Sequence, residues 1–215
     1  MSKNQGAAKK VHFIRHGEST WNVCRRQLKL NDRFPQQERP VIVDAPLSFK
    51  GMEQATKLKE KIDSIKPEIA VSSPYSRTLQ TCLTSYGSDK VVITPLCGEF
   101  MTGSSDNIGM PASCLKVMFP MFDFASLDEI WWYMPDGIKS QPEAVNLLTQ
   151  GKLTKEDQQH FESRAKEFHK FLCERPERNI AVYSHNDFLV FFLSKYFDIK
   201  TVHIANGEVS SLDFP

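Results

Sequence analysis

Short apolar runs alternate along the chain with longer segments in which apolar side chains recur every three or four residues. The short runs are typical of buried strands, and the last of them alternates like an edge strand. They occupy residues 11–14, 68–73, 91–96, 179–184 and 208–214. The longer segments predict helices that begin near residues 48, 74, 156 and 187. Strands and helices therefore follow one another along most of the chain.

This alternation predicts an α/β protein, a three-layer α/β/α sandwich around a mostly parallel central sheet. A length of 215 residues suits a single domain over residues 1–215. Residues 1–10 are polar, and we expect them to be a disordered lead-in. Residues 100–151 contain four prolines and many aromatic side chains. We expect this segment to be an insertion that covers the site as a lid.

Polar side chains follow three of the predicted strands at the point where each strand ends. Arg15 and His16 come directly after the first strand, Arg77 follows the second and His185 follows the fourth. The carboxyl ends of parallel strands meet at one edge of a sheet, where α/β proteins bind their ligands. A guanidinium group is a bidentate fork for phosphate. The sequence therefore predicts a phosphate pocket at this edge.

Local signals near these residues predict how they are presented. Ser73 is expected to cap the helix that carries Arg77, with Pro74 as its first residue. Arg77 then lies near the positive end of its own helix. Gly17 lacks a Cβ atom and is expected to let a ligand approach the backbone. His16 can attack a phosphoryl group through one neutral nitrogen if a backbone carbonyl holds the other.

Five motifs, in the same order along the chain, resemble the histidine phosphatase superfamily in its phosphoglycerate-mutase-like branch. They are R-H-G-E-S-T-W-N at 15–22, P-L-S-F-K-G at 46–51, S-S-P-Y-S-R-T-L-Q-T at 72–81, Gly98-Glu99 and Ser184-His185. The resemblance implies a phosphatase that hydrolyses a small phosphomonoester without a cofactor. It also implies that the substrate's phosphoryl group passes through a covalent phosphohistidine.

The resemblance assigns roles to single residues. His16 is the nucleophile, Arg15 and Arg77 clamp the phosphoryl oxygens, and His185 donates a hydrogen bond to them. Glu99 is the proton donor to the leaving oxygen and later the base that activates water. Asp106 is the competing acid, because it lies only seven residues further on.

Four further residues are expected to bind substrate. Asn22 would donate an amide hydrogen bond to phosphate, with Gly17 and Ser19 beside it. Asn186 stands where many relatives have glycine, so its side chain is expected to narrow the pocket. The aromatic run at 131–133 fits either the core or a wall over the substrate.

Bulk properties exclude several classes of function. The formal net charge is +1, which argues against a nucleic-acid or anionic-membrane binder. No apolar stretch approaches the roughly 20 residues of a membrane helix. Five cysteines without paired spacing favour reduced thiols and a cytoplasmic protein. We expect no metal ligands, and the oligomeric state stays open.

Two alternatives to a phosphatase remain. In the mutases of this branch, a lysine and paired arginines in the insertion hold the substrate. Here residues 100–138 contain one basic residue, Lys116, against five acidic ones. Such an insertion is expected to repel substrates with further negative charge, so a cofactor-dependent phosphoglycerate mutase is the second choice. A non-catalytic, partner-binding relative is less favoured, because every expected catalytic residue is present.

Overall fold

The computed structural model describes residues 9–29, 35, 38–135, 137–200 and 203–214. Most of the expected disordered lead-in, residues 1–8, lies outside the described residues. Its last two residues were wrongly included, because Lys9 and Lys10 already belong to the first strand, β1 (Lys9–Arg15). The Lys9 side chain is buried, and its Nζ donates to the carbonyl oxygens of Leu172 and Arg175 at 2.5 and 2.8 Å.

The centre of the molecule is a five-stranded sheet in the order β3-β2-β4-β1-β5. Four strands are parallel, and β5 pairs antiparallel with β1 at the edge. The strands other than β1 are β2 (Ile69–Ser72), β3 (Val91–Ile93), β4 (Asn179–Ser184) and β5 (Val209–Phe214). The predicted α/β fold with a mostly parallel sheet is confirmed.

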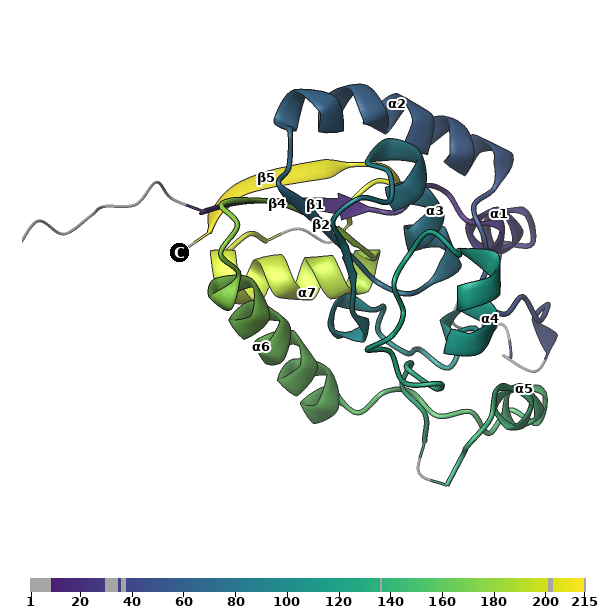
Figure 1. Cartoon of the computed structure of the whole chain (residues 1–215). Coiled ribbons are helices and arrows are strands. Elements are labelled where there is room, and N and C mark those ends of the chain that lie inside the picture. Colours follow the sequence, from purple (N-terminus) through teal and green to yellow (C-terminus); the bar gives the residue numbers. More distant parts are fainter. Residues whose placement is uncertain (1–8, 30–34, 36–37, 136, 201–202, 215) are drawn as a thin grey trace, which may run out of the picture.

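Helices cover both faces of the sheet (Figure 1). On one side lie α2 (Phe49–Ile65) and α3 (Ser76–Ser85), and on the other α6 (Gln158–Glu174) and α7 (Asn186–Phe197). Three shorter helices complete the described secondary structure: α1 (Thr20–Gln27), α4 (Ala112–Met118) and α5 (Gln141–Thr149). Two 3₁₀ turns lie at Pro95–Cys97 and Ser105–Asn107.

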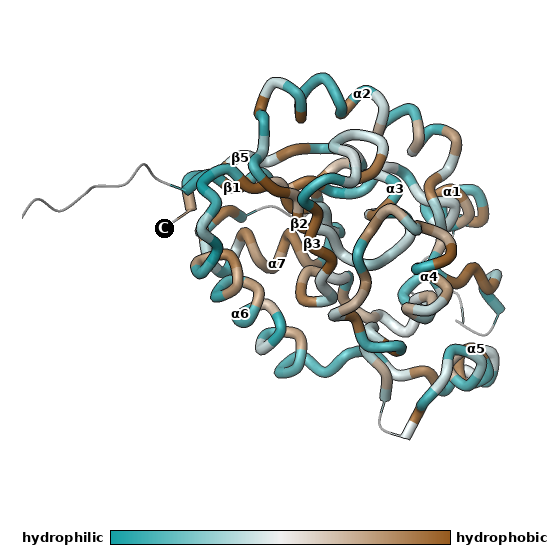
Figure 2. The backbone as a smooth tube through the Cα atoms, in the orientation of Figure 1, coloured by the Kyte–Doolittle hydropathy of each residue, from teal (hydrophilic) through white to brown (hydrophobic). Residues whose placement is uncertain are grey.

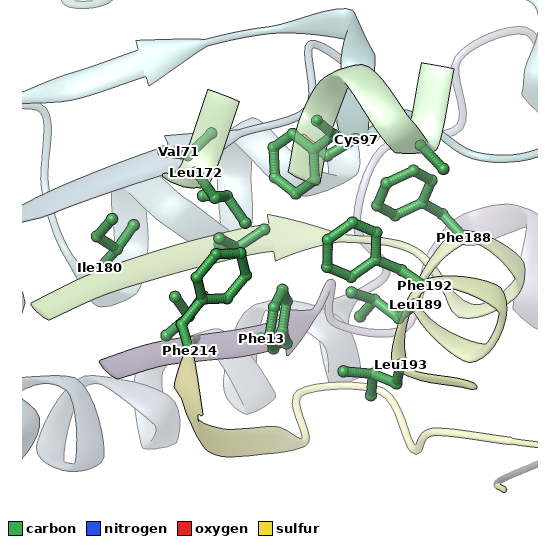
Figure 3. Packing of buried hydrophobic residues seen from close by; sticks show 14 of the residues in the cluster. Phe13, Val71, Cys97, Leu172, Ile180, Phe188, Leu189, Phe192, Leu193 and Phe214 are labelled. Carbon is green, nitrogen blue, oxygen red and sulfur yellow. The ribbon is translucent and has the colours of Figure 1, made fainter. Parts of the chain in front are cut away.

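The alternation of side chains along β1 divides the core into two layers. Phe13 points into the layer beneath α6 and α7, whereas Ile14 packs on the opposite side with Leu58 of α2. Figure 3 shows Phe13 among Phe188 and Phe192 of α7, all fully buried. In Figure 2 the tube is largely brown along β2 and β3 and through much of α7, whereas much of α2 and α6 is teal.

The expected insertion has a hydrophobic cluster of its own. Its aromatic and aliphatic side chains pack with Tyr75 and Leu79 beside α3 and with Ile93 of the edge strand β3. Both α4 and α5 contribute to this cluster, through Leu115 and Leu148. The assignment of one domain with a lid over residues 100–151 stays a prediction.

The start of α3 differs from the predicted one. The helix begins at Ser76 rather than Pro74, and its N-cap residue Tyr75 makes no side-chain capping bond. The carboxylate of Asp44 takes this place, accepting from the backbone N–H and the hydroxyl of Ser76 at 2.9 and 2.6 Å. Burial raises the pKa of Asp44 to about 6. Because Asp44 is remote in sequence, the local pattern favoured Ser73.

Phe13→Ala tests the layer beneath α6 and α7. Phe13 is fully buried, with its ring 5.6 Å from that of Phe192, so truncation leaves a cavity that the packed helices cannot fill. The free energy of unfolding should fall by about 3–5 kcal/mol, measured by urea denaturation. Phe49→Ala is the matched control, because Phe49 is 84% exposed and should change stability little. Equal effects would contradict the described packing.

Candidate active site

The carboxyl ends of β2, β4 and β1 lie side by side, since these strands are neighbours and parallel. Arg15 pairs with Ser184 in the register, and the His16 N–H donates to the Ser184 carbonyl at 3.1 Å. The rings of His16 and His185 are consequently 5.2 Å apart. Arg77, in the first turn of α3, reaches the same place from β2. The structure therefore brings these residues together at one edge of the sheet.

His16 is held in one tautomer. Its Nδ1 lies 2.7 Å from the carbonyl oxygen of Gly17, which can only accept, so Nδ1 carries the proton. The ring is 3% exposed, and burial together with Arg77 and Arg15 lowers its pKa well below the usual value. The imidazole is therefore neutral at physiological pH, with its Nε2 lone pair available.

Two buried guanidinium groups flank this ring. Arg77 donates from Nη1 to the carbonyl oxygen of Asp106 at 2.9 Å, and Arg15 donates from Nη1 to that of Ile204. The Nε of Arg15 is buried and has no hydrogen-bond partner among the described residues. A buried donor without an acceptor costs free energy. An anion at this position would satisfy it.

His185 contacts protein groups through both ring nitrogens. Its Nδ1 accepts from Arg77 Nε at 3.3 Å, and its Nε2 lies 2.9 Å from the Ser73 hydroxyl. Burial, followed by the charge of Arg77, lowers its pKa well below the usual value. In this arrangement His185 orients Arg77. Its direct contact with the phosphoryl group stays a prediction.

Glu99 lies at the amino end of α7, where its Oε1 accepts from the backbone N–H groups of Asp187 and Phe188, both at 3.1 Å. These bonds favour the carboxylate, but burial has the larger effect and, with nearby Asp187, raises the pKa of Glu99 to about 8. Glu99 is thus mostly protonated at neutral pH. Burial also raises the pKa of Asp106, whose Oδ1 accepts from the Ser104 hydroxyl at 2.6 Å. The geometry allows either Glu99 or Asp106 to be the general acid.

His16, Arg15, Arg77 and both acids open into a cavity of about 760 Å³, which His185 does not line. Most of the expected site residues line it, and they are Arg15, His16, Ser19, Asn22, Arg77, Glu99 and Asn186. The amide oxygen of Asn22 accepts from the backbone N–H of Ser19 at 3.0 Å, so its amide nitrogen is the group left to donate. Asn186 is tied to the 203–208 segment, because its Oδ1 accepts from the Ile204 N–H at 3.0 Å.

Gly17 does not line this cavity, contrary to the prediction. A Cβ atom at this position would lie 2.5 Å from the carbonyl oxygen of Gly51, at the start of α2. Gly17 is therefore required for close packing of the nucleophile loop on α2, not for access of a ligand. Its N–H donates to the hydroxyl of Thr81 in α3 at 3.1 Å.

The charges around the cavity also differ from the expected ones. Asp106 lines it, but three other acidic residues of the insertion, Asp123, Asp128 and Glu129, do not. The fifth, Asp136, lies outside the described residues. Three cations outside residues 100–151 line the cavity instead: Arg25, Arg39 and Lys155. The expected acidic lining was wrong, because composition along a segment does not say which side chains reach the site.

The aromatic run at 131–133 belongs mainly to the second hydrophobic cluster. Trp131 and Trp132 are buried there, and Trp131 Nε1 donates to the Met110 carbonyl at 2.8 Å. With Tyr133 and Glu99 they line a smaller cavity of about 260 Å³. They do not line the cavity that contains His16.

The sequence did not indicate a buried ion pair that holds the Glu99 segment. Arg164 of α6 donates to both carboxylate oxygens of buried Glu156, at 3.1 and 3.0 Å. It also donates to the carbonyl oxygens of Leu96, Gly98 and Glu99, at 3.0, 2.9 and 3.3 Å. One guanidinium group thus fixes the backbone on which Glu99 is placed. The only sequence signal was a charged residue on the helix face that is otherwise apolar.

Comparison with known proteins agrees with this geometry. The family model for the histidine phosphatase superfamily (branch 1) matches residues 11–104, which contain Arg15, His16, Arg77 and Glu99. A phosphoglycerate mutase-like protein of Arabidopsis thaliana is 23% identical over 249 aligned residues, covering 95% of this chain and 83% of that protein. Residues 11–104 thus match the histidine phosphatase superfamily (branch 1), and the chain as a whole is similar to a phosphoglycerate mutase-like protein.

Solved structures with the same fold are also found. The α-ribazole phosphatase of Shigella flexneri superposes with a TM-score of 0.59 and 21% identity, covering 95% of this chain and 90% of the other. A mycobacterial glucosyl-3-phosphoglycerate phosphatase, solved with VO₃, gives a TM-score of 0.56 and 16% identity, covering 95% and 90%.

Neither a metal-ligand cluster nor a membrane-spanning helix occurs in the described residues. No group of three or more histidine, cysteine, aspartate or glutamate side chains is arranged there to hold a metal ion. None of the helices in the same residues has the length and apolar character needed to cross a membrane. The five cysteines all fall within the described part of the chain, and none forms a disulfide.

Arg164→Lys tests whether this side chain holds the Glu99 segment. Lysine keeps the charge beside Glu156 but cannot reach the three carbonyl groups with one planar fork. Backbone amides of residues 98–101 should exchange with solvent about tenfold faster, since hydrogen bonds from a charged donor contribute about 1.5–3 kcal/mol. Arg175→Lys, at the far end of α6, is the control and should leave these amides unchanged. Unchanged exchange in Arg164→Lys would refute the assignment.

Proposed function

We propose that this protein is a phosphomonoester hydrolase that acts through a phosphohistidine at His16 on a small phosphorylated metabolite. The observation that carries the proposal is the state of His16. It is a neutral ring with Nδ1–H bound to Gly17 and Nε2 free, between two buried arginines. This is the arrangement that a nitrogen nucleophile for phosphorus requires.

In the first step, Nε2 of His16 attacks the phosphorus as the bond from phosphorus to the ester oxygen breaks. Arg15 and Arg77 stabilise the charge on the three non-bridging oxygens. The carboxyl group of Glu99 donates its proton to the leaving oxygen, so an alcohol departs. The positive charge on the phosphorylated ring is stabilised by the Gly17 carbonyl at Nδ1.

In the second step, water replaces the alcohol. The carboxylate of Glu99 removes one proton from this water, and its oxygen attacks phosphorus as the bond to Nε2 breaks. Inorganic phosphate leaves, His16 returns to the neutral state, and Glu99 is protonated again. Asn22 would donate its amide N–H to the phosphoryl group, with Ser19 and Asn186 beside it.

The names of the relatives support hydrolysis of a small phosphorylated compound. Two of the similar structures are phosphatases by name, for α-ribazole phosphate and glucosyl-3-phosphoglycerate, while the Arabidopsis relative is named phosphoglycerate mutase-like. No cofactor enters the proposed reaction, and neither nucleic acid nor membrane is a proposed partner. We propose the cytoplasm as its compartment, because all five cysteines are unpaired.

A phosphoglycerate mutase remains the second candidate. It is favoured by one observation, the cations Arg25, Arg39 and Lys155 around the cavity, which could hold a doubly charged substrate. Efficient conversion of 3-phosphoglycerate to 2-phosphoglycerate, stimulated by 2,3-bisphosphoglycerate, would decide for the mutase. Release of inorganic phosphate without isomerisation would decide for the phosphatase.

His16→Ala should abolish both the covalent intermediate and turnover. The wild-type protein, incubated with labelled p-nitrophenyl phosphate and denatured, should carry an acid-labile phosphoryl group that the variant lacks. Turnover should fall on the order of 10³-fold or more, since only transition-state binding remains. His12→Ala is the control histidine, because His12 contacts Ser211 and Asn179 in the sheet and not the cavity. An inactive wild type would favour the non-catalytic alternative.

Glu99 rather than Asp106 should be the general acid. Glu99→Gln should slow hydrolysis of alkyl phosphates far more than that of p-nitrophenyl phosphate, whose leaving group hardly needs a proton. Because the acid must be protonated and the pKa of Glu99 is about 8, wild-type kcat/KM for alkyl phosphates should fall as the pH rises through about 8. The variant should lack this decline. If Asp106→Asn shows both effects and Glu99→Gln does not, the roles are exchanged.

A further inference from the structure

The smaller cavity, of about 260 Å³, has no part in the proposed hydrolysis. Among the described residues, Glu99 alone lines both this cavity and the one that contains His16. Its volume lies just below the roughly 300–1,000 Å³ of pockets for drug-sized ligands, so it suits a ligand of few atoms.

Four aromatic side chains line this cavity, and they are Tyr75, Trp131, Trp132 and Tyr133. The ring of Trp131 is nearly perpendicular to that of Tyr75, at 78° and 4.7 Å, and to that of Trp132, at 81° and 5.5 Å. These rings therefore meet like the walls of a corner and not as a flat stack. The face of an aromatic ring carries partial negative charge and attracts organic cations, most strongly when the ring is that of tryptophan.

The polar groups of these aromatic side chains are mostly bound within the protein. The two indole N–H groups donate to the Met110 carbonyl oxygen at 2.8 Å and to the Met134 sulfur at 3.1 Å. The Tyr75 hydroxyl donates to the Asn107 carbonyl oxygen at 2.6 Å. The aromatic wall therefore offers a ligand ring surface rather than hydrogen-bond donors.

Arg164 is a cation of the lining, but it has no N–H group left for a ligand. A guanidinium group has five N–H donors. Here two of them bind the carboxylate of Glu156, and three bind the carbonyl oxygens of Leu96, Gly98 and Glu99. An anion in the cavity would therefore find its nearest positive charge already committed.

The lining has a surplus of negative charge instead. Glu167 of α6 lies on the cavity, and among the described ion pairs none involves it. Buried Glu156 is matched by Arg164 and also contacts His160, whose Nδ1 lies 2.7 Å from Oε1. Glu99 is mostly protonated at neutral pH. With His160 uncharged, the lining thus has one carboxylate more than it has cations.

We infer that this cavity binds a small organic cation, a quaternary or primary ammonium compound, with the ammonium group against the aromatic rings and Glu167. The site adjoins the catalytic groups, because the centre of the Tyr75 ring is 4.4 Å from Cζ of Arg77 and 5.1 Å from that of the His185 ring. The inference goes beyond the proposed hydrolysis and does not rest on it, since a ligand here need not meet His16.

Choline and 3,3-dimethylbutanol test the inference, because they have the same shape and only choline is charged. An NMR titration follows the indole N–H resonances, since Trp131 and Trp132 line this cavity whereas Trp21 lines the one at His16. Choline should shift the first two resonances and not that of Trp21, and it should bind about tenfold more tightly than the alcohol. Equal binding of the two compounds, or a shift at Trp21 instead, would overturn the inference.

Substitutions then assign the binding to the lining. Glu167→Gln should weaken choline binding about threefold, whereas Glu162→Gln, on the same helix but not on the cavity, should leave it unchanged. Tyr133→Leu should weaken binding about fivefold, and Tyr133→Phe, which keeps the ring, should stay within about twofold of the wild type. Glu167 is exposed and Tyr133 half-buried, so we expect these variants to fold. An equal loss in Glu162→Gln would indicate an effect of net charge and contradict the assignment.

Two further titrations separate this site from the proposed function. Choline should bind His16→Ala as it binds the wild type, and saturating inorganic phosphate should not displace it. Loss of choline binding in either titration would place the cation in the phosphate cavity and refute a separate site. Failure to form a phosphohistidine would count against the proposed hydrolase alone, because the choline titration needs no turnover.

Discussion

Two buried guanidinium groups beside one neutral imidazole are the constraint around which this site is organised. Removing a cation from water costs several kcal/mol unless other groups replace its hydration. Arg15 and Arg77 receive this replacement from the carbonyl oxygens of Ile204 and Asp106, not from carboxylates. Among the described ion pairs, none involves either arginine. Together with burial, which is the larger cause, their charge lowers the pKa of His16.

The strands and the core hold this unfavourable arrangement in place. β1 and β4 carry His16 and His185 on adjacent parallel strands, so the sheet's backbone bonds fix their separation. The apolar layer below, with Phe13 and Phe188, supplies stability that the polar edge does not. Buried cations at one edge of the sheet lower the stability of the fold. An apolar core is needed to offset this loss, since the net free energy of unfolding of a protein is small.

Sequence patterns were sufficient for the features that are local or repeated. Each strand end was visible as an apolar run followed by a polar residue, which located Arg15, His16, Arg77 and His185. Patterns failed where a contact comes from a remote segment. Asp44 caps α3 in place of Ser73, Gly17 packs against Gly51, and Arg164 holds the backbone at Glu99. In each of these cases the decisive atom lies at least 30 residues away in the chain.

Contacts between segments that are remote in sequence also explain why the charge of the substrate pocket was harder to predict than the catalytic residues. The expected catalytic side chains follow parallel strands, whose carboxyl ends meet at one edge of the sheet. Their convergence can therefore be inferred from the order of strands and helices along the chain. Arg25, Arg39 and Lys155, which also line the cavity, lie at a helix end and in two connections, whose paths depend on packing. Composition of residues 100–138 suggested a negative lining, yet α4 and the tryptophans of this segment pack around Leu79 instead. The charge that a substrate meets is thus a property of the folded surface and of the loops that reach it, not of the segment nearest to Glu99 in sequence.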